Sequence, residues 1–195
     1  PYTTLFRSLG IARRAEKGIE LRVHPTLIPD EQLIANVNGV KNAVLVQANA
    51  VGPTLYYGAG AGAGPTASAV VADVIDIVRD ISYTEDGAGT IPQLAFEALT
   101  NMPILSREEM TTGYYIRLNA EDQTGVLADV TTILSRAGIS IDAIMQQSRL
   151  KDLIPIVILT DPIVESKMDD ALAQIQALPA IRGEIVRIRL ESLDS

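Results

Sequence analysis

Two hydrophobic periods follow one another in a fixed order along residues 114–190, and few folds accommodate that order. Strand-like alternation of apolar and polar residues appears in "YYIRL", "ISIDAIMQQ", "LIPIVILT" and "EIVRIRL". Apolar residues at helical spacing cover residues 125–137 and again residues 168–178. We expect Thr124 to cap the first of these helices and Gly138 to end it. The βαββαβ order predicts a ferredoxin-like unit in an α+β protein.

The first 60 residues predict strands as well. In residues 19–28 the apolar Ile19, Leu21 and Val23 alternate with polar residues, as in a half-buried strand. Two further strands are expected at 42–50 and 54–57, and their short connection favours antiparallel pairing. The intervening residues 30–36 are compatible with a short helix.

Residues 65–79 have the spacing of an amphipathic helix. Pro65 suits the first helical position, where its missing N–H costs nothing. The aspartates of this segment share one face, which we interpret as a solvated face rather than a catalytic one. Residues 82–112 are mixed in pattern and are expected to form a connector with one short helix or strand. The apolar stripe of the helix consists of Val70, Val74, Ile77 and Ile81.

A glycine-dense segment, "TLYYGAGAGAGPTASAVVADV", precedes that helix. It fails the P-loop pattern, because no Lys follows its last glycine. Gly58, Gly60 and Ala63 nearly satisfy the dinucleotide fingerprint, but no second buried strand follows the helix. The segment can therefore complete a nucleotide site built mainly elsewhere. Alternatively it is a packed glycine turn without a ligand, and the glycines alone favour that alternative.

Composition excludes several classes of function. The absence of cysteine excludes a thiolate metal site, and the single histidine, His24, excludes a histidine-rich metal centre, so no metal-binding residue is predicted. The formal net charge of −8 argues against a nucleic-acid partner. No apolar run approaches the ~20 residues of a membrane-spanning helix. His24 could titrate near an active site, but a hydrogen-bonded histidine at a strand edge is the favoured interpretation.

The opening residues, "PYTTLFRS", read like a translated sequencing adapter. The alternative is a genuine short strand, but we favour an artefactual leader at residues 1–8 and leave them out of the expected fold.

Several motifs in order resemble one enzyme family. The segments "LGIARR", "IELRVHPTLIP", "NVNGVKNAVLV" and the glycine-dense segment are similar to the second half of bacterial homoserine dehydrogenase. The terminal "YYIRLNAEDQTGVLADVTTILSRAGISIDAIMQQ" resembles an ACT regulatory domain. The resemblance implies part of a catalytic domain with a mixed sheet at 9–80, the connector at 81–112 and an ACT domain at 113–191.

The resemblance also implies a reaction, the NAD(P)H-dependent reduction of L-aspartate 4-semialdehyde to L-homoserine in threonine and methionine biosynthesis. Gly62 matches a family glycine whose backbone contacts the nucleotide, and Gly60 is its neighbour, so both are expected to bind the cofactor. The family's Rossmann fingerprint and catalytic lysine lie upstream of the matching region. None of the lysines 17, 41, 151 and 167 sits in the lysine motif, so no catalytic residue is predicted here and the chain alone is expected to be inactive.

Regulation is expected in the C-terminal part. ACT domains commonly pair and hold an amino-acid effector, for which threonine is this family's usual choice, so a homo-oligomer is expected. The resemblance also implies a cytoplasmic location. The predicted effector-binding residues are Asn119, Asp122, Gly125 and Val126, where a glycine and a helix start can meet a carboxylate.

A second function remains open. The chain could be a purely regulatory amino-acid-binding module, in which residues 9–80 serve as a dimerisation platform and no catalysis occurs.

Overall fold

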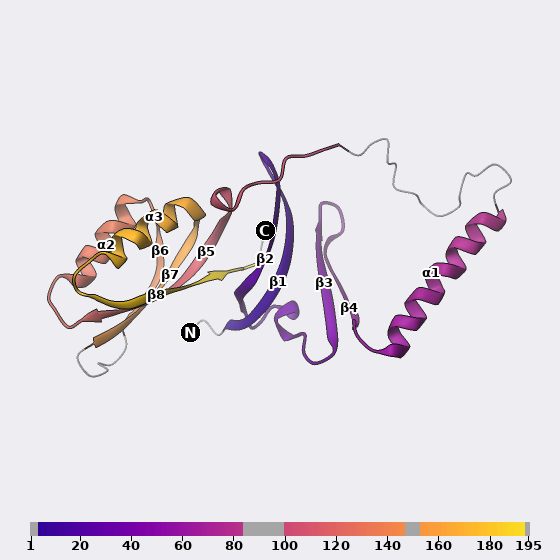
Figure 1. Cartoon of the computed structure of the whole chain (residues 1–195), viewed down its shortest axis with the longest axis horizontal. Helices are drawn as coiled ribbons and strands as arrows, with labels where there is room; N and C mark the ends of the chain where they lie inside the picture. The colour runs from indigo at the N-terminus through magenta and orange to yellow at the C-terminus, as the bar shows by residue number, and fades with distance from the viewer. Residues whose placement is uncertain (1–3, 84–99, 147–152, 194–195) are drawn as a thin grey trace. The chain divides into compact units, whose positions relative to one another are not determined.

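The computed structural model describes residues 4–83, 100–146 and 153–193. The chain divides into two compact units, one made of residues 1–30 and 102–195 and the other of residues 31–101. Figure 1 traces their helices and strands from the N-terminus in indigo to the C-terminus in yellow.

The C-terminal part of the first unit is the expected βαββαβ unit. Its four strands lie in the order β8-β5-β7-β6, and every neighbouring pair is antiparallel. This is the ferredoxin-like arrangement, so the prediction is confirmed. The elements are β5 (Thr111–Glu121), α2 (Val126–Arg136), β6 (Ile141–Gln146), β7 (Leu153–Val164), α3 (Glu165–Gln176) and β8 (Ile181–Leu190).

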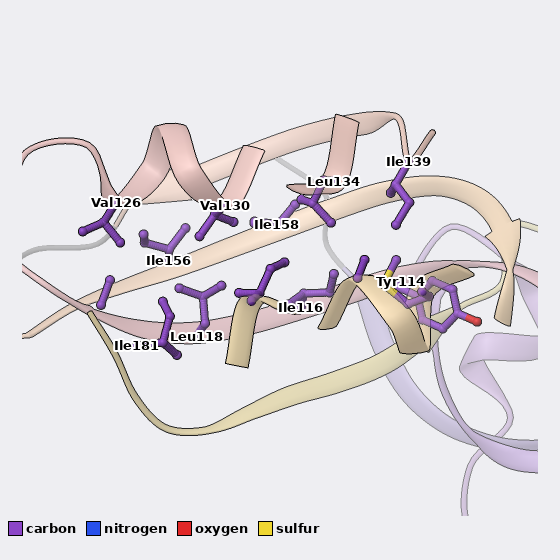
Figure 2. Packing of buried hydrophobic residues seen from close by; sticks show 14 residues of the cluster. Tyr114, Ile116, Leu118, Val126, Val130, Leu134, Ile139, Ile156, Ile158 and Ile181 are labelled. Atoms are coloured by element: carbon purple, nitrogen blue, oxygen red, sulfur yellow. The ribbon is translucent and has the colours of Figure 1, made fainter. Parts of the chain in front are cut away.

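A single apolar layer between the sheet and the two helices makes the core of this unit. Figure 2 shows Val126, Val130 and Leu134 of α2 facing Ile156 and Ile158 of β7. Every second residue of β5 and every third or fourth of α2 points into this layer, as the two periods require. The remaining fully buried members include Tyr114, Ile116, Met168, Ala171 and Ile175.

The two ends of α2 differ in how well the sequence predicts them. Gly138 has a φ of +71°, and its N–H donates to Ser135 O at 3.0 Å, so it closes the helix as expected. The prediction that Thr124 caps this helix was wrong. Gly125 occupies the N-cap position with a φ of +98°, and no side chain caps the helix. Thr124 thus lies one residue before the N-cap position, because the helix begins one residue later than a cap at Thr124 would require.

A long hairpin extends the sheet to six strands. β1 (Thr4–Ala15) and β2 (Gly18–Pro29) pair antiparallel along their whole length, in the order β1-β2-β8-β5-β7-β6. Leaving residues 1–8 out of the fold was therefore wrong for residues 4–8, which pair with residues 25–29. The hairpin also joins the unit that carries the ACT pattern, whereas we expected it to group with residues up to 80. The link is a parallel pairing of residues 26–27 with residues 189–190.

Polar and apolar residues alternate along β2 as expected, but the buried face of the strand is the polar one. Glu20, Arg22 and His24 are all less than a tenth exposed, whereas Leu21 is 45% and Val23 83% exposed. The charged groups tolerate burial because they pair with one another and with neighbouring strands. Alternation therefore predicted the strand, but ion pairing decided which face is covered.

The described part of the connector is anchored to β2. Ile19 N–H donates to Pro103 O at 2.8 Å, and Leu105 N–H donates to Ile19 O at 2.9 Å. Gly18 makes room for this crossing, because a Cβ there would lie 2.2 Å from Pro103 O. A short 3-10 helix, η3 (Arg107–Glu109), follows. Residues 84–99 of the predicted connector lie outside the described residues.

The second unit contains a hairpin and a long helix. A 3-10 turn, η1 (Leu33–Asn36), precedes β3 (Lys41–Ala48), which pairs antiparallel with β4 (Gly52–Ala59) as predicted. Helix α1 (Ala63–Tyr83) begins two residues before Pro65, which is therefore not its first residue. Within the part of this unit that the structure describes, Ala35 is the one buried hydrophobic residue.

The predicted apolar stripe of α1 faces solvent. Val70, Val74, Ile77 and Ile81 are between 53% and 71% exposed. A stripe of this width normally packs against another layer, so α1 has the composition of a covered helix without a cover in this unit. Among the described residues, no helix combines the length and apolar character that crossing a membrane requires.

Candidate functional site

The glycine loop lies between the β3–β4 hairpin and the start of α1. Gly60 N–H donates to Val40 O at 3.3 Å, which closes the hairpin beyond its last strand pair. Gly62 has a φ of +122°, and its carbonyl accepts the Thr66 N–H at 3.1 Å in the first turn of α1. That turn carries no acidic side chain. The loop thus offers main-chain groups beside a helix start that no side-chain anion occupies, which suits a negatively charged ligand.

The glycines of this loop serve different purposes. A Cβ on Gly60 would lie 1.5 Å from Asn42 Nδ2, so the Asn42 side chain occupies that space. A Cβ on Gly62 would make only an ordinary contact with Pro65 at 3.4 Å, so lack of space does not require glycine there. The positive φ of Gly62 does require it. Gly58 and Gly64 have open space where a side chain would be.

The predicted effector residues lie around the β5–α2 loop of the other unit. Asn119 sits in β5 between Pro155 and Arg182, and Asp122 is exposed in the loop. A Cβ on Gly125 would meet nothing within 4 Å, so space is open above the loop. The Val126 side chain belongs to the hydrophobic core, and only its main chain is available to a ligand. The cofactor and effector predictions thus fall in separate compact units.

A buried carboxylate that the sequence analysis missed organises the ACT part of the first unit. Glu165, the first residue of α3, is fully buried and accepts hydrogen bonds from Tyr114 Oη at 2.7 Å and Arg189 Nη2 at 2.6 Å. Arg187 Nη2 and Arg107 Nη2 lie 3.3 and 3.2 Å from its Oε1 atom. Arg187 and Arg189 alternate in "VRIRL", which places both on one face of β8, and that spacing was the available signal.

The electrostatics of this cluster follow from burial and charge together. Burial acts to raise the pKa of Glu165, but hydrogen bonds from Arg189 and Tyr114 and the charges of Arg189 and Arg187 together hold the pKa below its ordinary value of 4.5. Burial and the hydrogen bond to Glu165 raise the pKa of the Tyr114 hydroxyl well above its ordinary range. Tyr114 therefore stays a proton donor and Glu165 stays ionised.

A second charge cluster lies on the buried face of β2. Arg22 Nε pairs with Glu20 at 2.9 Å, and Arg22 Nη1 contacts both Glu191 and His24 Nε2. His24 Nδ1 lies 3.0 Å from Pro25 O, so the neutral ring donates from Nδ1 and accepts at Nε2. Burial is the main cause that lowers the pKa of His24 below 6.5. The interpretation of His24 as a hydrogen-bonded strand residue is confirmed, but its expected place at an edge was wrong, because β2 lies between β1 and β8.

Other candidate sites carry little chemistry. A shallow cleft of about 290 Å³ lies beside β8, lined by Phe6, Pro25 and Ile188 together with Arg187 and Arg189. Both arginines already pair with Glu165. The residues that the structure describes contain no cluster of three or more side chains suited to a metal ion.

Two family models match the chain. Residues 3–75 match the family described as homoserine dehydrogenase, and residues 114–179 match the ACT domain. The chain thus combines a region of the homoserine dehydrogenase type with an ACT domain, and the glycine loop lies in the first of these two regions.

Known proteins extend this match over nearly the whole chain. Homoserine dehydrogenase from Pseudomonas aeruginosa is 52% identical over 96% of this chain, and that from Neisseria gonorrhoeae is 49% identical over 95%. A crystal structure of homoserine dehydrogenase from Thiobacillus denitrificans superposes with a TM-score of 0.88 at 54% identity over 97% of this chain. The chain therefore matches the C-terminal region of homoserine dehydrogenases, a homoserine dehydrogenase segment followed by an ACT domain. It spans 43% to 44% of the length of these relatives.

Proposed function

We propose that this chain is the C-terminal part of a homoserine dehydrogenase that reduces L-aspartate 4-semialdehyde to L-homoserine with NAD(P)H. When bound, NAD(P)H would supply the hydride for the aldehyde carbon, and the carbonyl oxygen would take up a proton. The chain spans less than half of its relatives, so we assign no catalytic acid to any of its residues. Its own contribution is binding and regulation.

The single observation that carries this proposal is the loop of Gly60 and Gly62 at the start of α1. Gly62 is exposed, has a positive φ and carries no side chain, so its main chain is open to a ligand, whereas the Asn42 side chain fills the space beside Gly60. The first turn of α1 has no carboxylate that would repel a phosphate. The residues present therefore fit a nucleotide cofactor that a further domain holds on its other side.

The ACT part supports an amino-acid effector. Open space above Gly125 and the main-chain N–H groups at the start of α2 suit a carboxylate. We propose L-threonine as this effector, a homo-oligomer as the working assembly and the cytoplasm as its location.

The test is a chimaera in which residues 1–195 replace the matching C-terminal region of the Pseudomonas aeruginosa homoserine dehydrogenase. The chimaera is expected to oxidise NADPH or NADH only when aspartate 4-semialdehyde is present. The 195-residue chain alone is expected to show no turnover. A chimaera with a native circular-dichroism spectrum but no activity would contradict the proposal.

A purely regulatory module is the second candidate. The observation in its favour is that the hairpin and the ACT pattern form one compact unit with its own core, whereas the second unit buries only Ala35 among its described hydrophobic residues. Titration of the chimaera with NADPH separates the two functions. Cofactor binding that Gly62→Val weakens supports the enzyme, and effector binding without any cofactor binding supports the module.

A further inference from the structure

We propose that the buried ion pair between Arg22 and Glu191 is the joint through which the ACT domain acts on the region of the homoserine dehydrogenase type. The β1–β2 hairpin lies in the stretch that matches homoserine dehydrogenase, and β5 lies in the stretch that matches the ACT domain. The regulatory part of this inference rests on the proposed amino-acid effector. The joint itself rests on contacts within the first compact unit.

The main-chain seam between the hairpin and the ACT sheet is short. Residues 26–27 of β2 pair in parallel with residues 189–190 of β8, and the ladder extends no further. One more main-chain bond follows, from Glu191 N–H to Leu27 O at 3.0 Å. Since so few main-chain bonds hold the hairpin here, the side-chain contacts decide how firmly it is attached to the ACT sheet.

The Glu191 side chain is the centre of these contacts. Its Oε1 atom pairs with Arg22 Nη1 of β2 and accepts a hydrogen bond from Thr112 Oγ1 of β5 at 3.2 Å. The Arg22 and Glu191 side chains are only 3% and 10% exposed. A buried pair interacts more strongly than an exposed one, because water and salt screen it less. Glu191 directly follows β8, so its carboxylate fixes the hairpin against two strands of the ACT sheet.

The surroundings of the pair allow it to open. Arg22 Nε also lies 2.9 Å from Glu20 Oε1, and the Glu20 side chain is 2% exposed. If Arg22 separates from Glu191, the guanidinium keeps Glu20, and the Glu191 carboxylate keeps the Thr112 hydroxyl. Neither charge is then left alone, which avoids much of the usual cost of breaking a buried pair. Arg22 Nη2 is buried without a partner among the described residues, so the closed arrangement does not satisfy the guanidinium fully.

Strand β5 connects this joint to the proposed effector site. Thr112 lies near the start of β5, and the predicted effector residue Asn119 lies near its end. β5 pairs with β7 on one side and with β8 on the other, so it moves as a stiff element. A shift of β5 on effector binding changes the Thr112–Glu191 contact, and with it the pair to Arg22. The contacts give a continuous route, and the energetic coupling along it is what the experiment measures.

The experiment compares the chimaera with its Glu191→Gln variant, which removes the charge and keeps the shape of the side chain. The variant is expected to raise the L-threonine concentration for half-maximal inhibition about tenfold. Without threonine, kcat and both KM values are expected to stay within about twofold of the parent. The rise in melting temperature that threonine causes is expected to remain, so that effector binding is separated from inhibition.

Glu184→Gln is the matched control, because Glu184 is an exposed glutamate on β8. It is expected to leave inhibition by threonine unchanged. Unchanged inhibition in Glu191→Gln would overturn the proposal. Loss of threonine binding together with inhibition would overturn it as well, because Glu191 would then support only the effector site or the general stability of the fold.

A chimaera that is inactive, or that threonine does not inhibit, would instead contradict the proposed function. The joint is then decided by hydrogen exchange in the 195-residue chain. Glu191→Gln is expected to lower the protection of the amide at position 191 about tenfold, because the seam opens more often. The amide of Ile158, in the core of the ACT part, is expected to keep its protection. Equal protection at position 191 in both proteins would overturn the joint.

Discussion

Glu165 is a carboxylate without solvent contact, and its charge is sustained by the guanidinium groups of Arg107, Arg187 and Arg189. Arg187 also stacks over the Tyr114 ring, with its Cζ 5.5 Å from the ring centroid. An isolated buried carboxylate would be far costlier than a protonated one, so the arginines determine its ionisation. Removing Glu165 would leave Arg189 without its carboxylate partner, whereas Arg107 and Arg187 would keep Asp169.

We predict that Glu165→Ala lowers the free energy of unfolding by about 3 kcal/mol, because the arginines around it lose their shared acceptor. Urea denaturation of the 195-residue chain measures this. Asp170→Ala is the control on the same helix, since Asp170 is exposed, and its effect is expected to stay within about 0.5 kcal/mol. Equal effects of the two variants would contradict a structural role for the cluster.

The acid stability of the same cluster has a definite sign. The pKa of Glu165 is lower in the folded chain than its ordinary value of 4.5, so its stabilisation is complete above that value. The stabilisation is lost as the pH falls below 4.5 and through the folded-state pKa. We predict that urea midpoints of the parent fall more steeply in this window than those of Glu165→Gln. Parallel curves for the two proteins would show that Glu165 does not contribute.

His24 is the only histidine in the chain, so its titration can be followed without overlap from another imidazole. Protonation would place a proton on Nε2, where Arg22 now donates, so the folded state resists it. A lowered folded-state pKa means that stability is complete above 6.5 and declines as the pH falls below that value. We predict an NMR titration midpoint for the imidazole below 6.5, and a midpoint at or above 6.5 would contradict this environment.

At the scale of elements, the β5–α2 loop combines a left-handed glycine with an uncapped helix start. The positive φ of Gly125 leaves the first-turn N–H groups of α2 without a side-chain acceptor. Such groups are satisfied by water or by a ligand, and open space above the glycine admits either. The loop is therefore the element in which the proposed effector function is tested.

We predict that L-threonine raises the melting temperature of the 195-residue chain and that Gly125→Leu abolishes this shift. The leucine fills the open space and is disfavoured at positive φ, so a general loss of stability is expected as well. Gly138→Ala is the matched control, because its φ is also positive but it lies at the opposite end of α2. A threonine shift that survives Gly125→Leu would place the effector elsewhere.

At the scale of the whole molecule, the two compact units differ in how much apolar surface they bury. The first unit has a continuous core between sheet and helices, whereas the described residues of the second expose nearly all of their large apolar side chains. An exposed apolar area of this kind associates with whatever apolar surface is available.

We predict that the 195-residue chain binds a fluorescent apolar dye and self-associates, and that the chimaera does so much less. Val74→Asp with Ile77→Asp is expected to reduce dye binding by the chain, because both residues belong to the exposed stripe of α1. Sedimentation and dye fluorescence measure the two effects. Asp73→Ala, on the polar face, is the control and is expected to leave both unchanged.

Local pattern in the sequence was sufficient for much of the fold. The βαββαβ order, the β3–β4 hairpin and the end of α2 at Gly138 all follow from periods of two or 3.6 and from glycine at positive φ. These features depend on residues close together in the chain. The glycine loop was found for the same reason, since its unusual composition is local.

The tertiary structure decided everything that depends on distant partners. The hairpin of β1 and β2 joins the ACT sheet through a two-residue parallel pairing with β8, which no local period encodes. Arg22 and Glu191 are 169 positions apart, and their pairing on the buried side of β2 is part of what makes the polar face the covered one. Burial and ion pairing are properties of the assembled sheet, so the sequence supplied the strands and the fold supplied their partners.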